Sequence, residues 1–315
     1  MTLRIKKVCY MLEGDKLVEY VNINNKEYKL VIGNGTDDKY RKNFNTLTEK
    51  TFGFNFEKWY QDGYWKKQYI PYSLMDGDDV VSNVSVNIMD LEIFGKIKRY
   101  IQLGTVMTDV NYRKQGLLRA IMDRVILDWK DKGDLLYLFA NNSVLNFYQR
   151  FGFSEVKQYQ CTKLISNNGK LGVAQKLNMS DEGDRTLVYN KANIITPFSK
   201  IYMCGNAELI MFYCTMFMSN NIYYIKDHDA VVIANFVEDT MEILDIFCEK
   251  EVSIDLVLGY FTDENIKKVK LYFTPKDTSS YIEIPLVGED TLFVLGEDKM
   301  LLKNNQFMFP ELSHT

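Results

Sequence analysis

The stretch Val106-Met107-Thr108-Asp109-Val110-Asn111-Tyr112-Arg113-Lys114-Gln115-Gly116-Leu117-Leu118 contains the end of one predicted element and the beginning of the next. Apolar residues over 99–110 predict a strand, and from Gly116 onward apolar residues recur at helical spacing. Where a strand leads into a helix, unpaired backbone N–H groups at the helix N-terminus favour an anion. Gly116 leaves that backbone accessible, and Arg113 and Lys114 add positive charge. The stretch therefore favours a phosphate-binding loop, although a basic surface turn without a ligand has the same pattern.

The residues around this stretch predict a mixed α/β arrangement. The turn Asp76-Gly77-Asp78-Asp79 separates two runs that read as paired strands, and Gly133 is placed to end the helix that starts at Gly116. Strand, helix, strand and helix in close succession form a β-α-β unit on a mixed sheet. The predicted elements are helical pieces over 43–65 interrupted near Gly53, strands over 68–75, 80–89 and 99–110, a helix from 116, a strand over 135–140 and a helix over 144–151.

The second half reads as a weaker copy of the same order. Polar runs over 166–172 and 178–185 indicate a boundary, so we predict one domain over 1–165 and another over 166–315. The predicted elements of the second domain are strands over 222–225, 230–237 and 240–247, a helix near 255–261 and a strand over 269–273.

Composition excludes several classes of protein. Of the 315 residues 46% are apolar, enough for an extensive core, and the net charge of −4 gives no reason to expect nucleic acid or an anionic membrane as partner. The apolar run over 209–218 is shorter than the roughly 20 residues of a membrane span. Five scattered cysteines and two histidines predict no metal site, and reduced thiols are typical of a cytoplasmic protein.

Two motifs carry a family resemblance. The stretch over 106–118 resembles motif A of the GNAT acetyltransferase superfamily, [Gln/Arg]-x-x-Gly-x-[Gly/Ala], and Asn146-Phe147-Tyr148-Gln149-Arg150-Phe151-Gly152-Phe153 resembles the end of its motif B. Leu118 departs from the pattern, but Gly116-Leu117-Leu118-Arg119-Ala120 is similar to a run in the enhanced intracellular survival branch, whose members are longer. The resemblance reaches from about 41 to 164. It implies a GNAT-type mixed, mostly antiparallel sheet flanked by helices, followed here by a second, degenerate domain.

The resemblance also implies a reaction, in which acetyl-CoA donates an acetyl group to a primary amine by direct attack in a ternary complex. By this likeness the backbone of Val106 and Thr108 binds the pantetheine arm, Asn141 contacts the cofactor, and Tyr148 protonates the departing thiolate. A phenol, with an ordinary pKa near 10, is protonated at neutral pH. Without the resemblance, Tyr148 would be expected only to pack in an aromatic core. The residues implied for the pyrophosphate loop are Arg113, Lys114, Gln115, Gly116, Leu117 and Leu118.

The general base is left open. In the enhanced intracellular survival branch the C-terminal carboxylate is thought to reach the active site, so we predict the Thr315 carboxylate near Tyr148. The other candidates are Asp90, Glu92, Asp109, His228 and His314.

The second domain is predicted to bind no CoA. Residues 248–255 stand where its pyrophosphate loop would be, but they lack glycine and are acidic. This domain would instead shape the acceptor cleft or a homo-oligomer contact. The acceptor stays open between a polyamine, a peptide or protein amine and a small metabolite, as does transfer of a longer acyl group. A non-catalytic CoA-binding or interaction protein is the alternative, favoured by Leu118 and the missing base.

Overall fold

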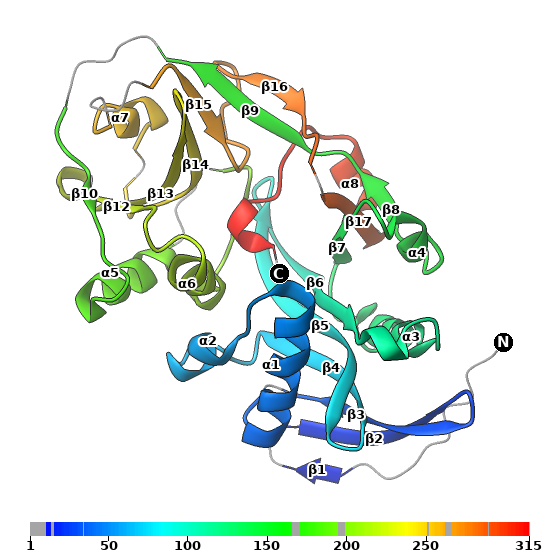
Figure 1. The fold of residues 1–315 in the computed structure, drawn as a ribbon. Coiled ribbons are helices and arrows are strands. Elements are labelled where there is room, and N and C mark those ends of the chain that lie inside the picture. Colours follow the sequence, from blue (N-terminus) through cyan, green and yellow to red (C-terminus); the bar gives the residue numbers. More distant parts are fainter. Residues whose placement is uncertain are drawn as a thin grey trace.

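The computed structural model describes residues 11–13, 16–33, 35–165, 171–194, 199–250, 252–261, 266–288 and 290–314. They form two mixed, mostly antiparallel sheets flanked by helices, which confirms the predicted fold class (Figure 1). No helix within these ranges combines the length and apolar character that a membrane span requires.

The first sheet has a single parallel pair of strands, β6 and β7, and all other neighbours are antiparallel. The predicted hairpin turn is confirmed, with Gly77 in the left-handed conformation at φ 62°. In spatial order the strands are β1 (Met11–Glu13), β2 (Lys16–Ile23), β3 (Lys26–Ile32), β4 (Tyr69–Asp76), β5 (Asp79–Ile93), β6 (Lys96–Thr108), β7 (Leu135–Asn141), β17 (Asp290–Gly296) and β8 (Ser154–Val156), with β11 (Ile201–Met203) paired to β5.

Helices cover both faces of this sheet. On one face α1 (Asp38–Phe52) buries Phe44 in a cluster with Tyr100 and Tyr137, and α2 (Glu57–Gln61) adds Trp59. On the other face α3 (Leu117–Trp129) packs its apolar stripe against the alternate residues of β6 and β7, such as Ile101 and Leu136. Because successive side chains of a strand point to opposite faces of the sheet, neighbouring residues of β6 and β7 belong to different cores.

The prediction that Gly133 ends α3 is wrong. The helix ends at Trp129, followed by a right-handed Lys130. A Cβ on Gly133 would lie 2.8 Å from Cγ1 of Ile101 and 2.9 Å from the carbonyl oxygen of Arg99. Glycine is therefore needed for the chain to pass close to β6 on its way into β7.

The second sheet contains the predicted strands over 222–225, 230–237 and 240–247 and, again, one parallel pair. Helices α5 (Glu182–Ala192) and α6 (Ala207–Met216) contribute to the core on one face and α7 (Ile254–Leu258) to that on the other. In spatial order the strands are β10 (Gln175–Lys176), β12 (Ile222–Ile225), β13 (Ala230–Val237), β14 (Thr240–Phe247), β15 (Lys268–Leu271), β9 (Tyr159–Leu164) and β16 (Ile282–Pro285).

The two sheets repeat one pairing pattern and exchange a strand. From β4 to β8, and again from β12 to β16, successive pairs are antiparallel, antiparallel, parallel, antiparallel and antiparallel. β9 follows the elements of the first sheet but joins the second, whereas β17 follows those of the second but joins the first (Figure 1). The boundary at residue 165 stays a prediction. The residues before it supply β9 to the second sheet, and those after it supply β11 and β17 to the first.

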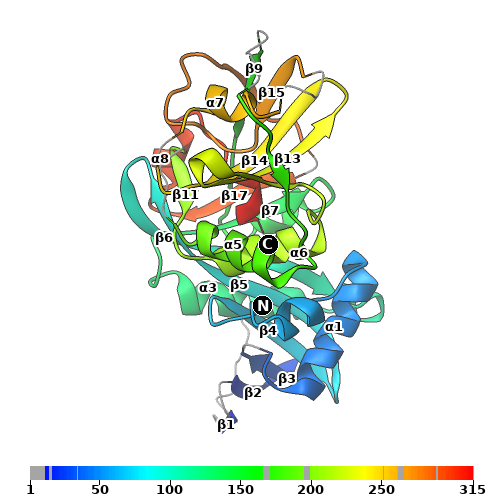
Figure 2. The same cartoon turned by 90° about the vertical axis from the view of Figure 1, so that its left-hand side faces the viewer.

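The C-terminal segment lies between the two sheets (Figures 1 and 2). After α8 (Lys299–Lys303), Phe307, Met308 and Phe309 are fully buried, and the Phe309 ring stacks on Tyr137 of β7 at 4.9 Å. The 3-10 turn η3 (Glu311–Ser313) follows and buries Leu312 against the second sheet. This anchoring brings the described end of the chain to the middle of the molecule.

Candidate functional site

A cleft opens where β6 and β7 separate. The two strands pair only from Tyr100 to Gln102 on β6 and from Leu135 to Tyr137 on β7. Beyond this point β6 stays paired with β5, and β7 with β17. The cleft has a volume of about 1000 Å³ and is lined by β6 from Leu103 to Thr108, the loop and first turn leading into α3, the end of β7, α4 (Leu145–Gln149) and Asp290.

A buried polar network holds the bend of β6 in place. The register with β5 shifts between Asn83 and Ser85, and Thr105 takes the left-handed φ of 46°. The fully buried Asn83 amide donates to the Thr105 carbonyl and to Ser85 Oγ, both at 2.9 Å, and accepts from Ser73 Oγ at 2.8 Å. Because every contact of this amide is internal, the bulge is fixed before any ligand binds.

The predicted phosphate loop closes one end of the cleft. Asp109 accepts the N–H of Asn111 and starts the turn η1 (Val110–Tyr112). Gly116 then has φ 83° at the N-cap of α3, and the first helical hydrogen bond runs from Ala120 N–H to the Gly116 carbonyl. The N–H groups of the first helical turn have no acceptor within the described residues, which is the arrangement that binds anions.

Two cations stand beside these N–H groups. Arg113 and Lys114 are exposed, line the cleft and have no carboxylate partner among the described residues. Gln115, by contrast, is not among the lining residues. Its side chain donates to the Asn111 carbonyl at 2.9 Å, and its own carbonyl accepts from Asn24 at 2.8 Å. Gln115 therefore shapes the loop, while Arg113 and Lys114 supply its positive charge.

The residues predicted along β6 and at the start of α3 line the same space. Val106 and Thr108 stand on the edge of β6 that has lost its partner strand, and Gly116, Leu117 and Leu118 form the end of the cleft. Leu117 is buried under the helix and Leu118 is half-buried. The structure thus brings the predicted strand and loop residues, except Gln115, to one cleft.

Asn141 and Tyr148 form the opposite wall. Asn141 ends β7, and its Oδ1 accepts the N–H of Ser143 at 3.0 Å, which turns the chain into α4. Tyr148 is only 4% exposed, and its ring packs near Phe153 and Phe293. Burial raises the pKa of Tyr148 to about 12, so its hydroxyl is protonated at neutral pH. Tyr148 thus packs in the aromatic core and also lines the cleft, and its role as the acid stays a prediction.

The predicted carboxylate candidates for the base have structural partners. Asp90 binds Arg99 at 2.7 Å, and Glu92 accepts the hydroxyl of Tyr202. Asp109 caps the turn at the start of the loop. A carboxylate already engaged in such bonds is poorly placed to take a proton from an incoming amine.

The two histidines differ in position. His228 packs edge-on to Tyr260 in the second half, at 5.5 Å. His314 stacks on Phe139, a lining residue of the cleft, at 3.5 Å between ring centroids, and Tyr213 donates to its carbonyl at 2.8 Å. Burial lowers the pKa of His314 to about 3, so the imidazole is neutral. Thr315 lies outside the described residues, and its role stays a prediction.

Asp290 and Phe139 are among the lining residues that the sequence did not single out. Asp290 begins β17 opposite Asn141, and Phe139 precedes the end of β7. The apolar run after Asp290 is typical of a strand, yet nothing in it tells which sheet the strand joins.

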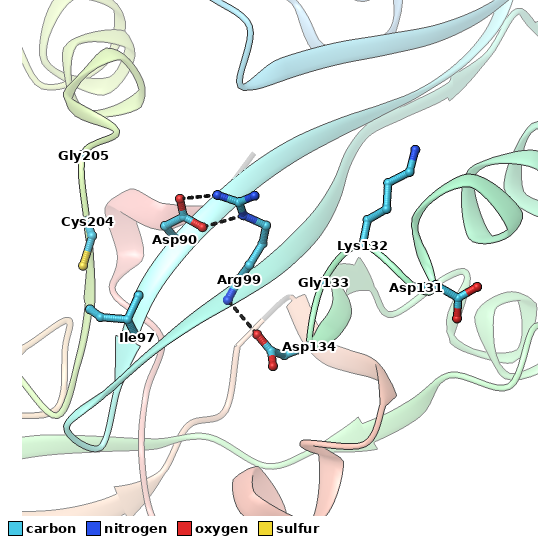
Figure 3. A pocket seen from close by; sticks show the side chains of 9 residues that line it. All are labelled: Asp90, Ile97, Arg99, Asp131, Lys132, Gly133, Asp134, Cys204 and Gly205. Carbon is cyan, nitrogen blue, oxygen red and sulfur yellow. Dashed lines mark hydrogen bonds and ion pairs between the residues drawn. The ribbon is translucent and has the colours of Figure 1, made fainter.

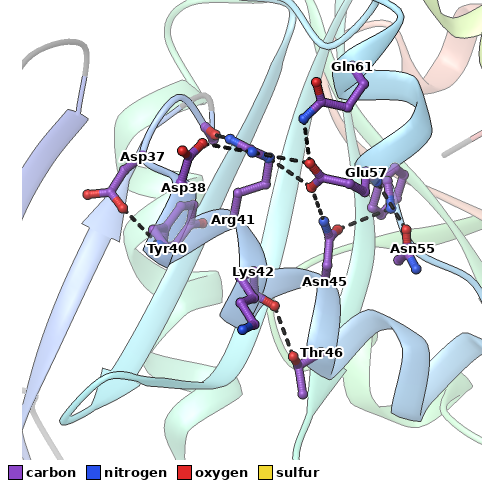
Figure 4. Close-up of polar contacts among 12 residues, drawn as sticks. Asp37, Asp38, Tyr40, Arg41, Lys42, Asn45, Thr46, Asn55, Glu57 and Gln61 are labelled. Atoms are coloured by element: carbon purple, nitrogen blue, oxygen red, sulfur yellow. Dashed lines mark hydrogen bonds and ion pairs between the residues drawn. The ribbon is translucent and has the colours of Figure 1, made fainter.

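Two other hollows are lined by charges that neutralise one another. In the first, Arg99 grips Asp90 through two nitrogens and gives its backbone N–H to Asp134 (Figure 3). In the second, Arg41 binds Glu57 between α1 and α2 (Figure 4). Because these charged side chains are already paired, neither hollow is expected to bind a ligand. Among the described residues, no three His, Cys, Asp or Glu side chains are grouped to hold a metal.

Comparisons with known proteins agree with this geometry. Residues 35–156 match the family model described as an acetyltransferase (GNAT) domain, close to the range over which the resemblance was predicted. A curated protein of Melanoplus sanguinipes entomopoxvirus, named as a candidate glycylpeptide N-tetradecanoyltransferase, is 23% identical over 215 residues. That match covers 68% of this chain and 63% of the relative, so this chain spans just under two thirds of the relative's length.

Solved structures share the fold across most of the chain. Eis1 from Mycobacterium abscessus matches with a TM-score of 0.54 and 11% identity, covering 84% of this chain and 72% of that one. A GCN5-related N-acetyltransferase from Kribbella flavida matches with a TM-score of 0.52 and 14% identity, covering 85% and 71%. Residues 35–156 therefore match the model of a GNAT acetyltransferase domain, and the chain shares the fold of these acetyltransferase structures over most of its length.

Proposed function

We propose that this chain transfers an acyl group from an acyl-CoA to a primary amine, with both substrates bound at once. One observation carries the proposal: the cleft between β6 and β7 has the cationic, glycine-containing loop at one end and the buried Tyr148 on its wall. Acetyl-CoA is the donor expected from the sequence. The name of the viral relative supports a wider range of donors.

The residues present fit an acyl-CoA. The N–H groups at the start of α3, with Arg113 and Lys114, would hold the pyrophosphate. The free edge of β6 at Val106 and Thr108 would hold the amides of the pantetheine arm, as a strand edge holds an extended peptide. The thioester would then lie deeper in the cleft, toward Thr105.

The proposed reaction needs no covalent enzyme intermediate. The neutral amine attacks the thioester carbonyl carbon, the C–N bond forms, the C–S bond breaks, and the amine proton passes to a base or water. A thiol ionises near pKa 8.5, about three units below Tyr148, so Tyr148 is the weaker acid. Its hydroxyl therefore stabilises the departing thiolate chiefly through a hydrogen bond, and solvent completes the protonation.

The second candidate is a CoA-binding protein without turnover. The structural bonds of Asp90, Glu92 and Asp109 favour it, because they leave no obvious base among these three. Three further expectations stay proposals: that the Thr315 carboxylate lies near Tyr148, that the protein is cytoplasmic, and that the second half binds no CoA.

Release of free thiol from acyl-CoA in the presence of an amine panel tests the proposal. We expect amine-dependent release, and a Tyr148→Phe variant about 10²-fold slower or more, as for loss of one hydrogen-bond donor to the developing negative charge. Binding of CoA to this variant should be unchanged, because the ring and its packing remain. If Tyr148→Phe and wild type release thiol at the same rate, Tyr148 has no role; if neither does with any amine, the non-catalytic reading stands.

A further inference from the structure

A second, apolar hollow adjoins the cleft, and we refer to it as the aromatic pocket. It has a volume of about 260 Å³. Its walls come from the end of α1, the α1–α2 connection and α6, so both halves of the chain contribute. The lining residues are Phe52, Phe54, Phe56, Trp59, Tyr69, Thr105, Leu209, Phe212, Tyr213 and Phe217.

The aromatic pocket adjoins the cleft. Phe52 and Thr105 line both spaces. Along β6 the order from the phosphate loop inward is Thr108, Val106 and then Thr105, where the aromatic pocket begins. A CoA thioester that follows β6 inward from the loop would therefore carry its acyl group to the opening of this pocket.

The chemistry of the walls suits an apolar guest. The polar groups that line the pocket are already paired: the hydroxyls of Tyr69 and Thr105 with each other, Trp59 Nε1 with the Glu208 carbonyl at 2.8 Å, and the Tyr213 hydroxyl with the His314 carbonyl. A guest that needs hydrogen bonds would lose those it makes with water. A hydrocarbon chain loses none.

The walls are also preformed. Asn45 accepts the N–H of Phe56 at 3.1 Å and donates to Glu57, which Arg41 holds from the other side (Figure 4). The Phe56 ring stacks on Phe212 of α6 at 5.2 Å. The hydrogen bonds of Asn45 and the ion pair between Arg41 and Glu57 thus hold in place the loop that forms one wall of the aromatic pocket.

We propose that the aromatic pocket binds the acyl chain of a medium-chain acyl-CoA, of about eight carbons. The proposal rests on the proposed function, since it assumes that a CoA thioester follows β6. A methylene takes about as much room as one water molecule in the liquid, about 30 Å³, so the 260 Å³ of the pocket hold eight or nine carbons. A tetradecanoyl chain is too long for this volume, and an acetyl group leaves most of it unfilled.

Calorimetric titration of CoA, acetyl-CoA, octanoyl-CoA and tetradecanoyl-CoA, each below its micelle concentration, tests this. Each buried methylene should tighten binding up to about fourfold, so octanoyl-CoA, with six more methylenes, should bind up to about 4000-fold more tightly than acetyl-CoA. Tetradecanoyl-CoA should bind less tightly than octanoyl-CoA. Equal affinities for acetyl-CoA and octanoyl-CoA, with CoA bound, would overturn the pocket assignment alone. No binding of CoA itself would instead overturn the proposed function.

Paired variants separate the pocket from general effects. Leu209→Trp fills the pocket and should bring the affinity for octanoyl-CoA down to that for acetyl-CoA, with CoA unchanged. Leu127→Trp makes the same substitution on the exposed side of α3, where Leu127 is 60% exposed, and should change neither affinity. If Leu209→Trp does not fold, Phe212→Ala enlarges the pocket and should shift the preference toward tetradecanoyl-CoA. A folded Leu209→Trp variant with wild-type affinity for octanoyl-CoA refutes the assignment, as does an unchanged chain-length preference in Phe212→Ala.

Discussion

Gly116 offers the sharpest test of the phosphate loop, because its backbone and electrostatic roles can be separated. Its φ of 83° favours glycine, yet a Cβ built there meets no atom within 4 Å. Gly116→Ala therefore adds only the left-handed backbone penalty of roughly 1–2 kcal/mol, without a clash. Gly116→Glu adds the same penalty and a carboxylate beside the expected site of the pyrophosphate.

The difference between the two variants isolates the charge. Two like charges about 5 Å apart repel by about 0.8 kcal/mol in bulk water and by about 3 kcal/mol at an effective dielectric constant of 20. A pyrophosphate with two charges doubles these values, so Gly116→Glu should bind CoA at least about tenfold more weakly than Gly116→Ala. Raising the salt to 1 M, where the screening length is about 3 Å, should shrink the gap.

Calorimetry at 25 °C in low and high salt measures both effects. Melting curves of the two variants without ligand serve as the control and should coincide, because Gly116 is exposed. The reasoning is refuted if the Glu and Ala variants bind CoA equally well in low salt, since the phosphates would then lie elsewhere.

Three further predictions follow from buried groups and from the chain end. Burial lowers the pKa of His314 to about 3, against 6.5 in the unfolded chain, so stability is lost as the pH falls below 6.5. Between pH 6.5 and 5, urea unfolding should show wild type losing about 1.6 kcal/mol more than His314→Phe, and equal losses would contradict this. Asn83→Leu leaves Ser73 Oγ and the Thr105 carbonyl without their amide partner, which should lower the free energy of unfolding by about 2–4 kcal/mol in the same assay; a change under about 0.5 kcal/mol, the usual range for surface substitutions, would mean the bulge does not depend on it. Removing Thr315 should slow amine-dependent thiol release and leave CoA affinity unchanged if its carboxylate is the base; unchanged release argues against that role.

Elements with strong local signals could be predicted from the sequence. The alternation in β5, the Asp-Gly turn before it and the helical stripe of α3 are each encoded within a few residues, and all three are observed. The interruption near Gly53 is likewise observed, with φ 79° after the end of α1. Loop residues such as Gly116 could be predicted for the same reason, because a sequence motif also lies within a few residues.

Features built from distant residues could not be predicted. The strands β9 and β17 are not among those expected from the sequence, and their exchange between sheets depends on which edge each one meets after folding. The aromatic pocket forms only because Phe56 and Phe212, from different halves of the chain, come into contact. The spacing of apolar residues in the sequence does not predict such a contact. The role of Gly133 was misassigned because glycine is required there by the close approach of β6, the strand next to β7, which is distant in the sequence pattern of the helix.

A crystal structure of the chain with CoA would show whether the cofactor lies in the cleft between β6 and β7. We expect pyrophosphate oxygens within hydrogen-bond distance of the N–H groups at the start of α3, the pantetheine arm along Val106 and Thr108, and the sulfur beside the Tyr148 hydroxyl. CoA bound outside the cleft between β6 and β7, or with its phosphates away from Gly116, would contradict this expectation.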